Sequence, residues 1–247
     1  MKLTETQFER FKTHCLEEYP REAVGCISNG WYKPLENIAE DDDAFEVDSK
    51  ALYALENVSA VLHSHCIDID SDEARENRRR SFDGRTPSMA DVKLHQRLDV
   101  PCGIAECSGE WVNEPLWLGD DEHAPLIGRK FVYHINDCYT LVRAYYKEKY
   151  DVDLIDHHAP WEWWTEEDGE GEYIEMFGTA GFYEVDIRDA QEGDVFLMKF
   201  RSSMCNHLAV NIGNGKILHH MIGQISQEVP MSKWAPYIKK TLRYHFD

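Results

Sequence analysis

The chain lacks long apolar runs and has few basic residues, and both features exclude classes of protein. No apolar run approaches the roughly 20 residues that a membrane-spanning helix needs. Lysine and arginine together number 26, against 46 aspartates and glutamates, for a formal net charge of −20. So acidic a surface repels the phosphates of nucleic acids and anionic membranes. We therefore expect neither a membrane span nor a nucleic-acid partner.

Paired cysteine motifs and an N-terminal signal segment are also missing. The seven cysteines form no Cys-x-x-Cys pair, and their odd number does not suit a disulfide framework. The residues after Met1 open a polar helix, with Thr4 and Gln7 spaced as a capping box, and not an apolar signal segment. We expect synthesis in a cytoplasm, mostly small buried cysteines, and at least one reactive thiol.

The chain is long enough for two domains joined by a linker. Apolar residues make up 43% of the 247 residues, which can fill two hydrophobic cores. Residues 113–126 contain two prolines, a glycine and an acidic run, a composition typical of a linker. We therefore expect a first domain over residues 1–112 and a second over residues 127–247. Residues 66–86 have little apolar content and predict a long mobile insertion.

A first set of chemistry-bearing residues consists of Glu22, His63, His65, Ser88 and Asp91. His63 and His65 end an apolar strand pattern, and side chains two apart on a strand face the same side. With the carboxylate of Asp91 they can supply the three protein ligands of a catalytic zinc, whose fourth position is left for water. Glu22 is then a candidate base for that water, and Ser88 a candidate hydrogen-bond partner of the water or of a developing oxyanion.

Each of these residues also has an ordinary structural interpretation. A His-x-His pair is by itself a weak indicator of metal binding. Ser88, three residues before Asp91, suits the N-terminal cap of a helix, because Asp can replace the usual Glu. Glu22 alone would be a surface carboxylate.

Taken in order, Glu22-Ala-Val-Gly25, His63-Ser-His65 and Ser88-Met-Ala-Asp91 resemble the JAMM motif of the JAB/MPN metallopeptidases. The resemblance covers residues 1–112. It implies a curved β-sheet flanked by helices, zinc held by His63, His65 and Asp91, and Glu22 as general base. Two features depart from the family pattern. The spacer between His65 and Ser88 has 22 residues, and Cys66 stands where relatives commonly have proline and could compete as a soft ligand.

Cys138 is the candidate nucleophile of a second site. Asn136 or Asp137 is a suitable N-cap, which places Cys138 in the first turn of a helix. There the helix dipole favours a thiolate, and an activated cysteine needs such a lowered pKa and a neighbouring base. For any single cysteine, the ordinary alternative is a small buried apolar residue.

Two histidines flank a predicted hairpin whose loop is Gly213-Asn214-Gly215. If the loop has three residues, Ala209 is opposite His219, and His207 and His219 then share a face. A two-residue loop would separate them. In the first case Cys138 attacks, His207 is the base, and His219 orients His207. His220, next in sequence, leaves the third member ambiguous.

These pieces resemble the NlpC-like cell-wall peptidases. The matching segments are Asp137–Val142, Gly193-Asp194 and the stretch from His207 to His219, which is the most specific signal. The resemblance covers residues 127–247. It implies a papain-like fold, a triad of Cys138, His207 and His219, and cleavage of amide bonds next to diaminopimelate in peptidoglycan stem peptides. Tyr139 replaces the serine that commonly follows the nucleophile.

Three tryptophans, Trp161, Trp163 and Trp164, cluster in one segment of the second domain. They could line a substrate groove or dock on another subunit. Packing in the core is the ordinary interpretation for at least one of them.

A chain with a JAMM-like domain followed by an NlpC-like domain resembles the tail-tip assembly proteins of lambda-like long-tailed bacteriophages. The resemblance implies an α+β protein with an MPN-like domain and a papain-like NlpC-type domain, holding Zn²⁺. The implied partners are other tail-tip proteins and peptidoglycan stem peptides. The implied locations are the host cytoplasm during assembly and the tail tip of the virion, acting at the host cell wall.

Two other functions remain open. Both hydrolase folds could serve as binding modules of a structural or assembly factor without activity, because a fold does not guarantee a reaction. An isopeptidase acting on a ubiquitin-like modifier is a third possibility, and the NlpC-like half argues against it.

Overall fold

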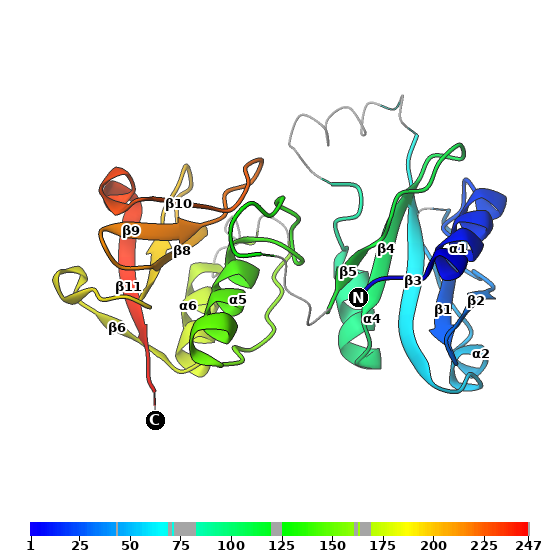
Figure 1. Cartoon of the computed structure of the whole chain (residues 1–247), viewed down its shortest axis with the longest axis horizontal. Coiled ribbons are helices and arrows are strands. Elements are labelled where there is room, and N and C mark those ends of the chain that lie inside the picture. Colours follow the sequence, from blue (N-terminus) through cyan, green and yellow to red (C-terminus); the bar gives the residue numbers. More distant parts are fainter. Residues whose placement is uncertain are drawn as a thin grey trace. The chain divides into compact units, whose positions relative to one another are not determined.

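The computed structural model describes residues 1–42, 44–68, 71, 83–119, 125–160, 163 and 169–246. The chain divides into two compact units, Met1–Glu122 with Val132–Ile135, and His123–Phe131 with Asn136–Asp247. Each unit combines one sheet with its own helices, so the fold is mixed α+β (Figure 1). Most of the predicted insertion lies outside the described residues. No helix in the described ranges combines the length and the apolar composition of a membrane span.

A five-stranded sheet in the order β2-β1-β3-β4-β5 forms the centre of the first unit. β3 and β4 run parallel, and the other neighbouring strands are antiparallel. A parallel pair needs a crossover connection, which here contains α4. The elements are α1 (Glu5–Glu18), β1 (Val24–Ser28), β2 (Trp31–Leu35), α2 (Ser49–Tyr53), β3 (Val58–Cys66), α4 (Met89–Leu98), β4 (Cys102–Cys107) and β5 (Leu116–Leu118).

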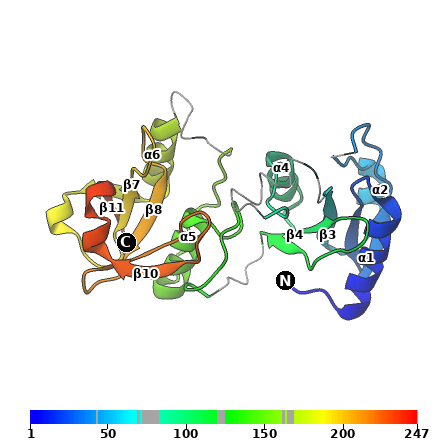
Figure 2. The ribbon, with the colours of Figure 1, turned by 90° about the horizontal axis from the view of Figure 1, so that it is seen from above.

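Alternate residues of β3 face different helices. Leu62 packs in a hydrophobic cluster with residues of α1, whereas Val61 packs in another cluster with residues of α4. Because successive side chains on a strand point to opposite faces, α1 and α4 cover opposite faces of the sheet (Figure 2). His63 and His65 share the parity of Val61 and therefore face α4.

The start of the expected linker, residues 113–126, is instead part of the first sheet. β5 pairs with β4, with Leu118 opposite Cys102 and Trp117 opposite Gly103. Leu118 is buried in a cluster with Cys102 and a residue of α4. The indole of Trp117 lies 2.9 Å from where a Cβ of Gly103 would be, so the missing side chain of Gly103 makes room for it. Pro115 and Gly119 flank this strand, and the first unit continues to Glu122, so the division between the units falls later in the predicted segment.

The second unit contains a six-stranded antiparallel sheet in the order β10-β9-β8-β7-β11-β6. Its elements are α5 (Cys138–Tyr150), α6 (Gly169–Thr179), β6 (Phe182–Val185), η2 (Ile187–Asp189), β7 (Val195–Met198), β8 (His207–Asn211), β9 (Lys216–His219), β10 (Gln227–Pro230), η3 (Met231–Lys233), η4 (Ala235–Tyr237) and β11 (Ile238–Tyr244).

Two hydrophobic clusters lie on this sheet. The larger joins α5 and α6 to alternate residues of β7 and β8, such as Leu197 and Leu208. The smaller joins the intervening residues, such as Ala209, to Trp234 and to Met231 of the short helical turn η3. Trp163 is buried in the larger cluster, so core packing, the ordinary interpretation for at least one of the three tryptophans, applies to it. Trp161 and Trp164 lie outside the described residues.

Candidate functional site

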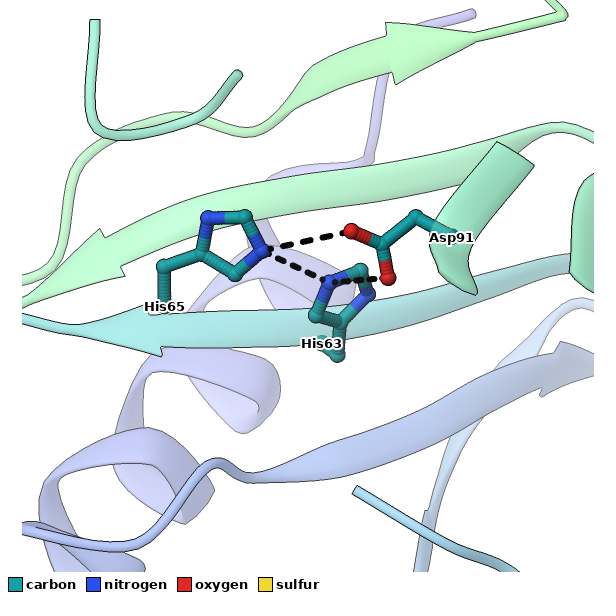
Figure 3. A group of neighbouring side chains, drawn as sticks. All are labelled: His63, His65 and Asp91. Atoms are coloured by element: carbon teal, nitrogen blue, oxygen red, sulfur yellow. Dashed lines mark hydrogen bonds and ion pairs between the residues drawn. The ribbon is translucent and has the colours of Figure 1, made fainter. Parts of the chain in front are cut away.

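Three candidate metal ligands meet on the face of the first sheet that α4 covers. His63 and His65 extend from β3, and Asp91 comes from the first turn of α4 (Figure 3). His63 Nε2 lies 3.1 Å from Asp91 Oδ1, and His65 Nε2 lies 3.5 Å from Asp91 Oδ2. The two Nε2 atoms are 3.2 Å apart. In the described part of the chain, these are the only three His, Cys, Asp or Glu side chains whose ligand atoms all lie within 4.8 Å of one another.

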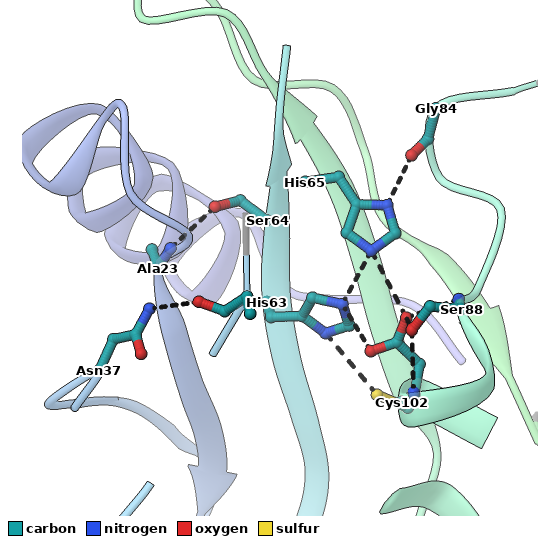
Figure 4. Close-up of polar contacts among 10 residues, drawn as sticks. Ala23, Asn37, His63, Ser64, His65, Gly84, Ser88 and Cys102 are labelled. Carbon is teal, nitrogen blue, oxygen red and sulfur yellow. Dashed lines mark hydrogen bonds and ion pairs between the residues drawn. The ribbon is translucent and has the colours of Figure 1, made fainter. Parts of the chain in front are cut away.

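A hydrogen bond on the outer side of His65 fixes the direction of its lone pair. His65 Nδ1 lies 2.7 Å from the carbonyl oxygen of Gly84, which can only accept, so Nδ1 carries the hydrogen (Figure 4). In neutral His65 the Nε2 lone pair then faces His63 Nε2 and the Asp91 carboxylate. A hydrogen on His63 Nε2, a proton on His65 or a metal ion between these atoms would relieve the repulsion of the converging lone pairs. Two imidazole nitrogens, one carboxylate and a carbonyl that orients an imidazole fit a catalytic zinc.

The pKa shifts of Asp91 and His65 favour a negative carboxylate beside a positive charge, whereas burial keeps His63 neutral. Burial alone raises the pKa of Asp91, but His63 and His65 outweigh it and hold that pKa well below its usual range. Burial lowers the pKa of His63 against the attraction of Asp91. For His65, burial is outweighed by the hydrogen bond and charge of Asp91, helped by Glu22 and Gly84, and the pKa is raised.

Ser88 is engaged with Asp91. Its main-chain N–H and its hydroxyl both donate to Asp91 Oδ2, at 2.7 Å and 2.8 Å. The hydroxyl oxygen also accepts from Asp91 N at 3.2 Å, which completes a capping box at the start of α4 (Figure 4). The capping interpretation of Ser88 is therefore confirmed. Its hydroxyl hydrogen is directed to the carboxylate of Asp91 in this structure.

Glu22 is buried, with 7% of its surface exposed, so it is not an ordinary surface carboxylate. Asn37 donates to its carbonyl oxygen at 2.8 Å, and Ala23 N donates to Ser64 Oγ at 2.9 Å. After burial and Asp91, the charge of Glu22 is the next influence on the pKa of His65. The carboxylate of Glu22 therefore acts electrostatically on His65.

Cys66 does not belong to this cluster, and the expectation that it could compete as a ligand is wrong. It follows His65 on β3 and points to the opposite face, where it packs with the core residues around α1. Its Sγ donates to the carbonyl oxygen of Arg21 at 3.1 Å. His65 and Asp91 are brought together although 22 residues separate His65 from Ser88.

The local geometry predicted for the second site is confirmed at two points. Asp137 caps α5, accepting from Tyr139 N at 3.0 Å and from Thr140 N at 2.9 Å, and the helix begins with Cys138. In the hairpin, Ala209 is opposite His219. The loop residues 213–215 all have positive φ, which two glycines and an asparagine tolerate.

This register brings two histidine rings together. His207 Nε2 lies 3.1 Å from His219 Nδ1, with both rings buried. The Cys138 thiol contacts the main-chain amide of Leu208, the residue after His207. Within the described residues, no hydrogen bond joins the thiol to the ring of His207. Such catalytic contacts are often longer before substrate binds.

Burial keeps the thiol and the imidazoles uncharged. It raises the pKa of Cys138 to about 12, although the amides of Leu208, Cys138 and Tyr139 act in the opposite direction. The lowered pKa expected at the helix terminus is therefore wrong for this state, because desolvation outweighs the amide groups. Burial and then His219 lower the pKa of His207, and burial and then His220 lower that of His219 to about 4.

Two further side chains complete the surroundings. His219, not His220, faces His207, which answers the ambiguity in the sequence; the ring of His220 packs edge-on against Phe131, with ring centroids 5.2 Å apart. The indole of Trp234 lies with its centroid 4.3 Å from that of His219. Sequence patterns did not indicate Trp234, because it reaches the histidines only through tertiary packing.

Residues 128–243 match the NlpC/P60 family, so the second unit is an NlpC/P60 domain. The tail tip assembly protein K of Escherichia phage N15 is 28% identical over 242 residues, which are 94% of this chain and 91% of that protein. The protein of the same name from Escherichia phage lambda is 38% identical over 149 residues, 60% of this chain and 69% of that protein. The chain therefore belongs to the family of tail tip assembly protein K. A solved NlpC/p60 domain, from the peptidoglycan hydrolase SagA, is 16% identical, with 48% of this chain and 89% of that chain covered and a TM-score of 0.34.

Proposed function

We propose that this chain is a cysteine peptidase of the phage tail tip that cleaves amide bonds in peptidoglycan stem peptides. The observation that carries the proposal is the 3.1 Å contact between His207 Nε2 and His219 Nδ1. It lies in a segment that matches the NlpC/P60 family, beside a helix that begins with Cys138. A thiol, an imidazole base and a group that orients the base are the parts of a thiol peptidase.

In the proposed reaction, Cys138 Sγ gives its proton to His207 and attacks the carbonyl carbon of the scissile amide. The carbon–nitrogen bond breaks as His207 returns the proton to the leaving amine, and a thioester remains on Cys138. Water then attacks the thioester while His207 takes a proton from it, the carboxylate product leaves, and the thiol is restored. His219 occupies the Nε2 side of His207, so Nδ1 is the nitrogen left for the thiol.

In this proposal the thiol of Cys138 keeps its proton in the resting state and gives it up only during the reaction. Burial holds Cys138 and His207 in their uncharged forms, since it raises the pKa of the first and lowers that of the second. The amides at the start of α5 then favour the thiolate as it forms. We therefore expect little thiolate at neutral pH in the absence of substrate.

We also propose that the chain acts with other tail-tip proteins, as the names of its two phage relatives suggest. Assembly would take place in the host cytoplasm, and the finished tail tip would carry the peptidase to the host cell wall. The competing function is an assembly factor that uses the same fold only for binding.

Release of soluble fragments from dye-labelled peptidoglycan under reducing conditions tests the peptidase. We expect the full chain to release dye and Cys138→Ala to release none. Cys66→Ala is the matched control, because Cys66 and Cys138 are the two residues among the seven free cysteines that are not classed as buried. The control should keep the wild-type rate. If the folded wild-type chain releases no more dye than Cys138→Ala, the binding function replaces the peptidase.

A second proposal concerns the first unit, which we propose to be an MPN-like zinc peptidase domain. It is supported by the meeting of His63, His65 and Asp91 and by the tautomer that Gly84 imposes on His65. Bound zinc would supply Lewis acidity at a carbonyl and acidify a water molecule.

The other residues of the first site have roles around those ligands in this proposal. Glu22, which is buried and acts electrostatically on His65, would accept the proton of the attacking water. Ser88 would hold the carboxylate of Asp91 through two hydrogen bonds to Oδ2. Such contacts behind a ligand orient it and tune its affinity.

Metal analysis after dialysis tests the zinc site. We expect about one zinc per wild-type chain and loss of zinc in His63→Ala and in Asp91→Ala. Cys66→Ala should retain zinc, because its thiol faces away from the cluster. Zinc that persists in both ligand variants would show that the metal binds elsewhere. If the folded wild-type chain binds no zinc, the zinc proposal fails. The cluster is then a structural ion pair between protonated His65 and Asp91.

A further inference from the structure

One nitrogen of the histidine pair is buried without a polar partner. His219 Nδ1 faces His207 Nε2, but among the described residues His219 Nε2 has no hydrogen-bond partner and no solvent contact. A buried N–H group without a partner is costly, and native structures rarely leave one. The surroundings of this atom therefore need an explanation.

The nearest aromatic ring to His219 is the indole of Trp234. The ring centroids are 4.3 Å apart and the planes are inclined at 66°, so the edge of one ring is directed at the face of the other. The face of an indole carries negative charge density and accepts N–H groups as a weak hydrogen-bond acceptor. Trp234 is itself held in place by main-chain bonds from Trp234 N to Met231 O and from Tyr237 N to Trp234 O, both 2.9 Å.

The hydrogen positions follow from the proposed peptidase, on which this step rests. His207 must keep the Nδ1 lone pair free to take the proton of Cys138, so its hydrogen is on Nε2 and is donated to His219 Nδ1. Burial lowers the pKa of His219 to about 4, so at neutral pH the ring is uncharged and has one N–H. That hydrogen is then on Nε2, the atom without a polar partner.

We propose that Trp234 is a positioning residue of the peptidase: its indole face accepts the Nε2–H of His219. This contact fixes the tautomer of His219, which fixes the tautomer of His207. The other tautomer of His219 would place a hydrogen on Nδ1 and turn the His207 hydrogen toward the thiol, where it blocks proton transfer. Trp234 therefore selects the reactive arrangement of both rings without touching substrate.

Long-range ¹H–¹⁵N spectroscopy of the ¹⁵N-labelled full chain tests the proposal directly. We expect one histidine with a protonated Nε2 and an unprotonated Nδ1, whose Nε2 proton is shifted upfield by the ring current of the indole. The signal is assigned to His219 by its loss in His219→Asn. Trp234→Leu should remove the upfield shift, and Trp234→Phe should keep it because an aromatic face remains.

Phe200→Leu is the matched control for packing. The ring centroid of Phe200 lies 5.7 Å from that of Trp234 and 5.2 Å from that of Tyr237, so Phe200 belongs to the same aromatic group. This variant should keep the upfield signal. An unchanged Nε2 proton in Trp234→Leu, or a wild-type His219 with its hydrogen on Nδ1, would overturn the proposal.

Kinetics with labelled peptidoglycan distinguish this proposal from the peptidase itself. Trp234→Leu should lower kcat about two- to fivefold, with KM nearly unchanged, because losing the stabilisation of a weak N–H···π contact changes a rate by about this factor. Trp234→Phe should recover most of the rate. If the wild-type chain shows the upfield signal but no cleavage, the peptidase fails while the His219–Trp234 contact stands. If the wild-type chain cleaves peptidoglycan but the His219 signal is unchanged in Trp234→Leu, the peptidase stands and the proposed role of Trp234 fails.

Discussion

Acidification should destabilise the second unit through its buried histidines, and His220 offers a test outside the proposed triad. The ring is fully buried. Burial, followed by the charge of Arg129, lowers the pKa of His220 to about 4 although Asp137 acts against this. The folded pKa is below the unfolded value of 6.5, so the unfolded chain binds more protons between these two pH values. The stabilising contribution is complete above pH 6.5 and is lost as the pH falls toward 4.

The size of the effect follows from the proton linkage. At pH 5 an unfolded histidine is almost fully protonated, whereas folded His220 is still mostly neutral. Going from pH 7 to pH 5 therefore removes about 2 kcal/mol of stability for each such group. A domain has roughly 5–15 kcal/mol in total, so the change is measurable.

Urea unfolding of the wild-type chain and of His220→Gln at both pH values measures this loss. Glutamine does not titrate, so the free energy of unfolding should fall by about 2 kcal/mol less in the variant than in wild type. His245→Gln removes an exposed histidine of the same unit and should behave like wild type. The same pH dependence in wild type and His220→Gln would refute the inference that this ring is held neutral by burial.

Three other substitutions test separate parts of the structure. Gly84→Ala would place a Cβ against the carboxylate of Glu106 and displace the carbonyl that orients His65, so zinc affinity measured by competition with a chelator should fall about tenfold. Thr4→Ala removes the side-chain cap of α1 and should lower the free energy of unfolding by about 1 kcal/mol in urea titrations. Leu118→Ala should cost about 2–5 kcal/mol in the same assay if β5 is a packed strand, and almost nothing if the segment is a linker.

Short-range rules predicted much of both candidate sites. His63 and His65 share a face because strand side chains alternate, and Ser88 caps the helix that carries Asp91 because the spacing of the two residues suits a capping box. The His207–His219 register follows from a loop of two glycines and an asparagine with positive φ. Each of these features is decided within a few residues of the chain, where sequence patterns are informative.

Features decided by tertiary packing were missed or wrongly predicted. Residues 116–118 looked like a linker because Pro115 and Gly119 flank only three strand residues, and their partner strand is contributed by Cys102–Cys107. The pKa of Cys138 was expected to fall at a helix terminus, but burial by distant parts of the unit raises it. Trp234 packs against His219 on one face of the sheet, and no local pattern records such a contact.

The place of β11 has a consequence for biosynthesis. β11 follows all the other strands of the second unit in sequence, yet it lies between β7 and β6 in the sheet. While a ribosome is still translating, β6 has no neighbour and the edge of β7 is open. The sheet that supports the proposed thiol chemistry closes only after residues 238–244 have left the exit tunnel. A chain shortened before residue 238 should therefore expose two unpaired strand edges, which are prone to pairing with other chains.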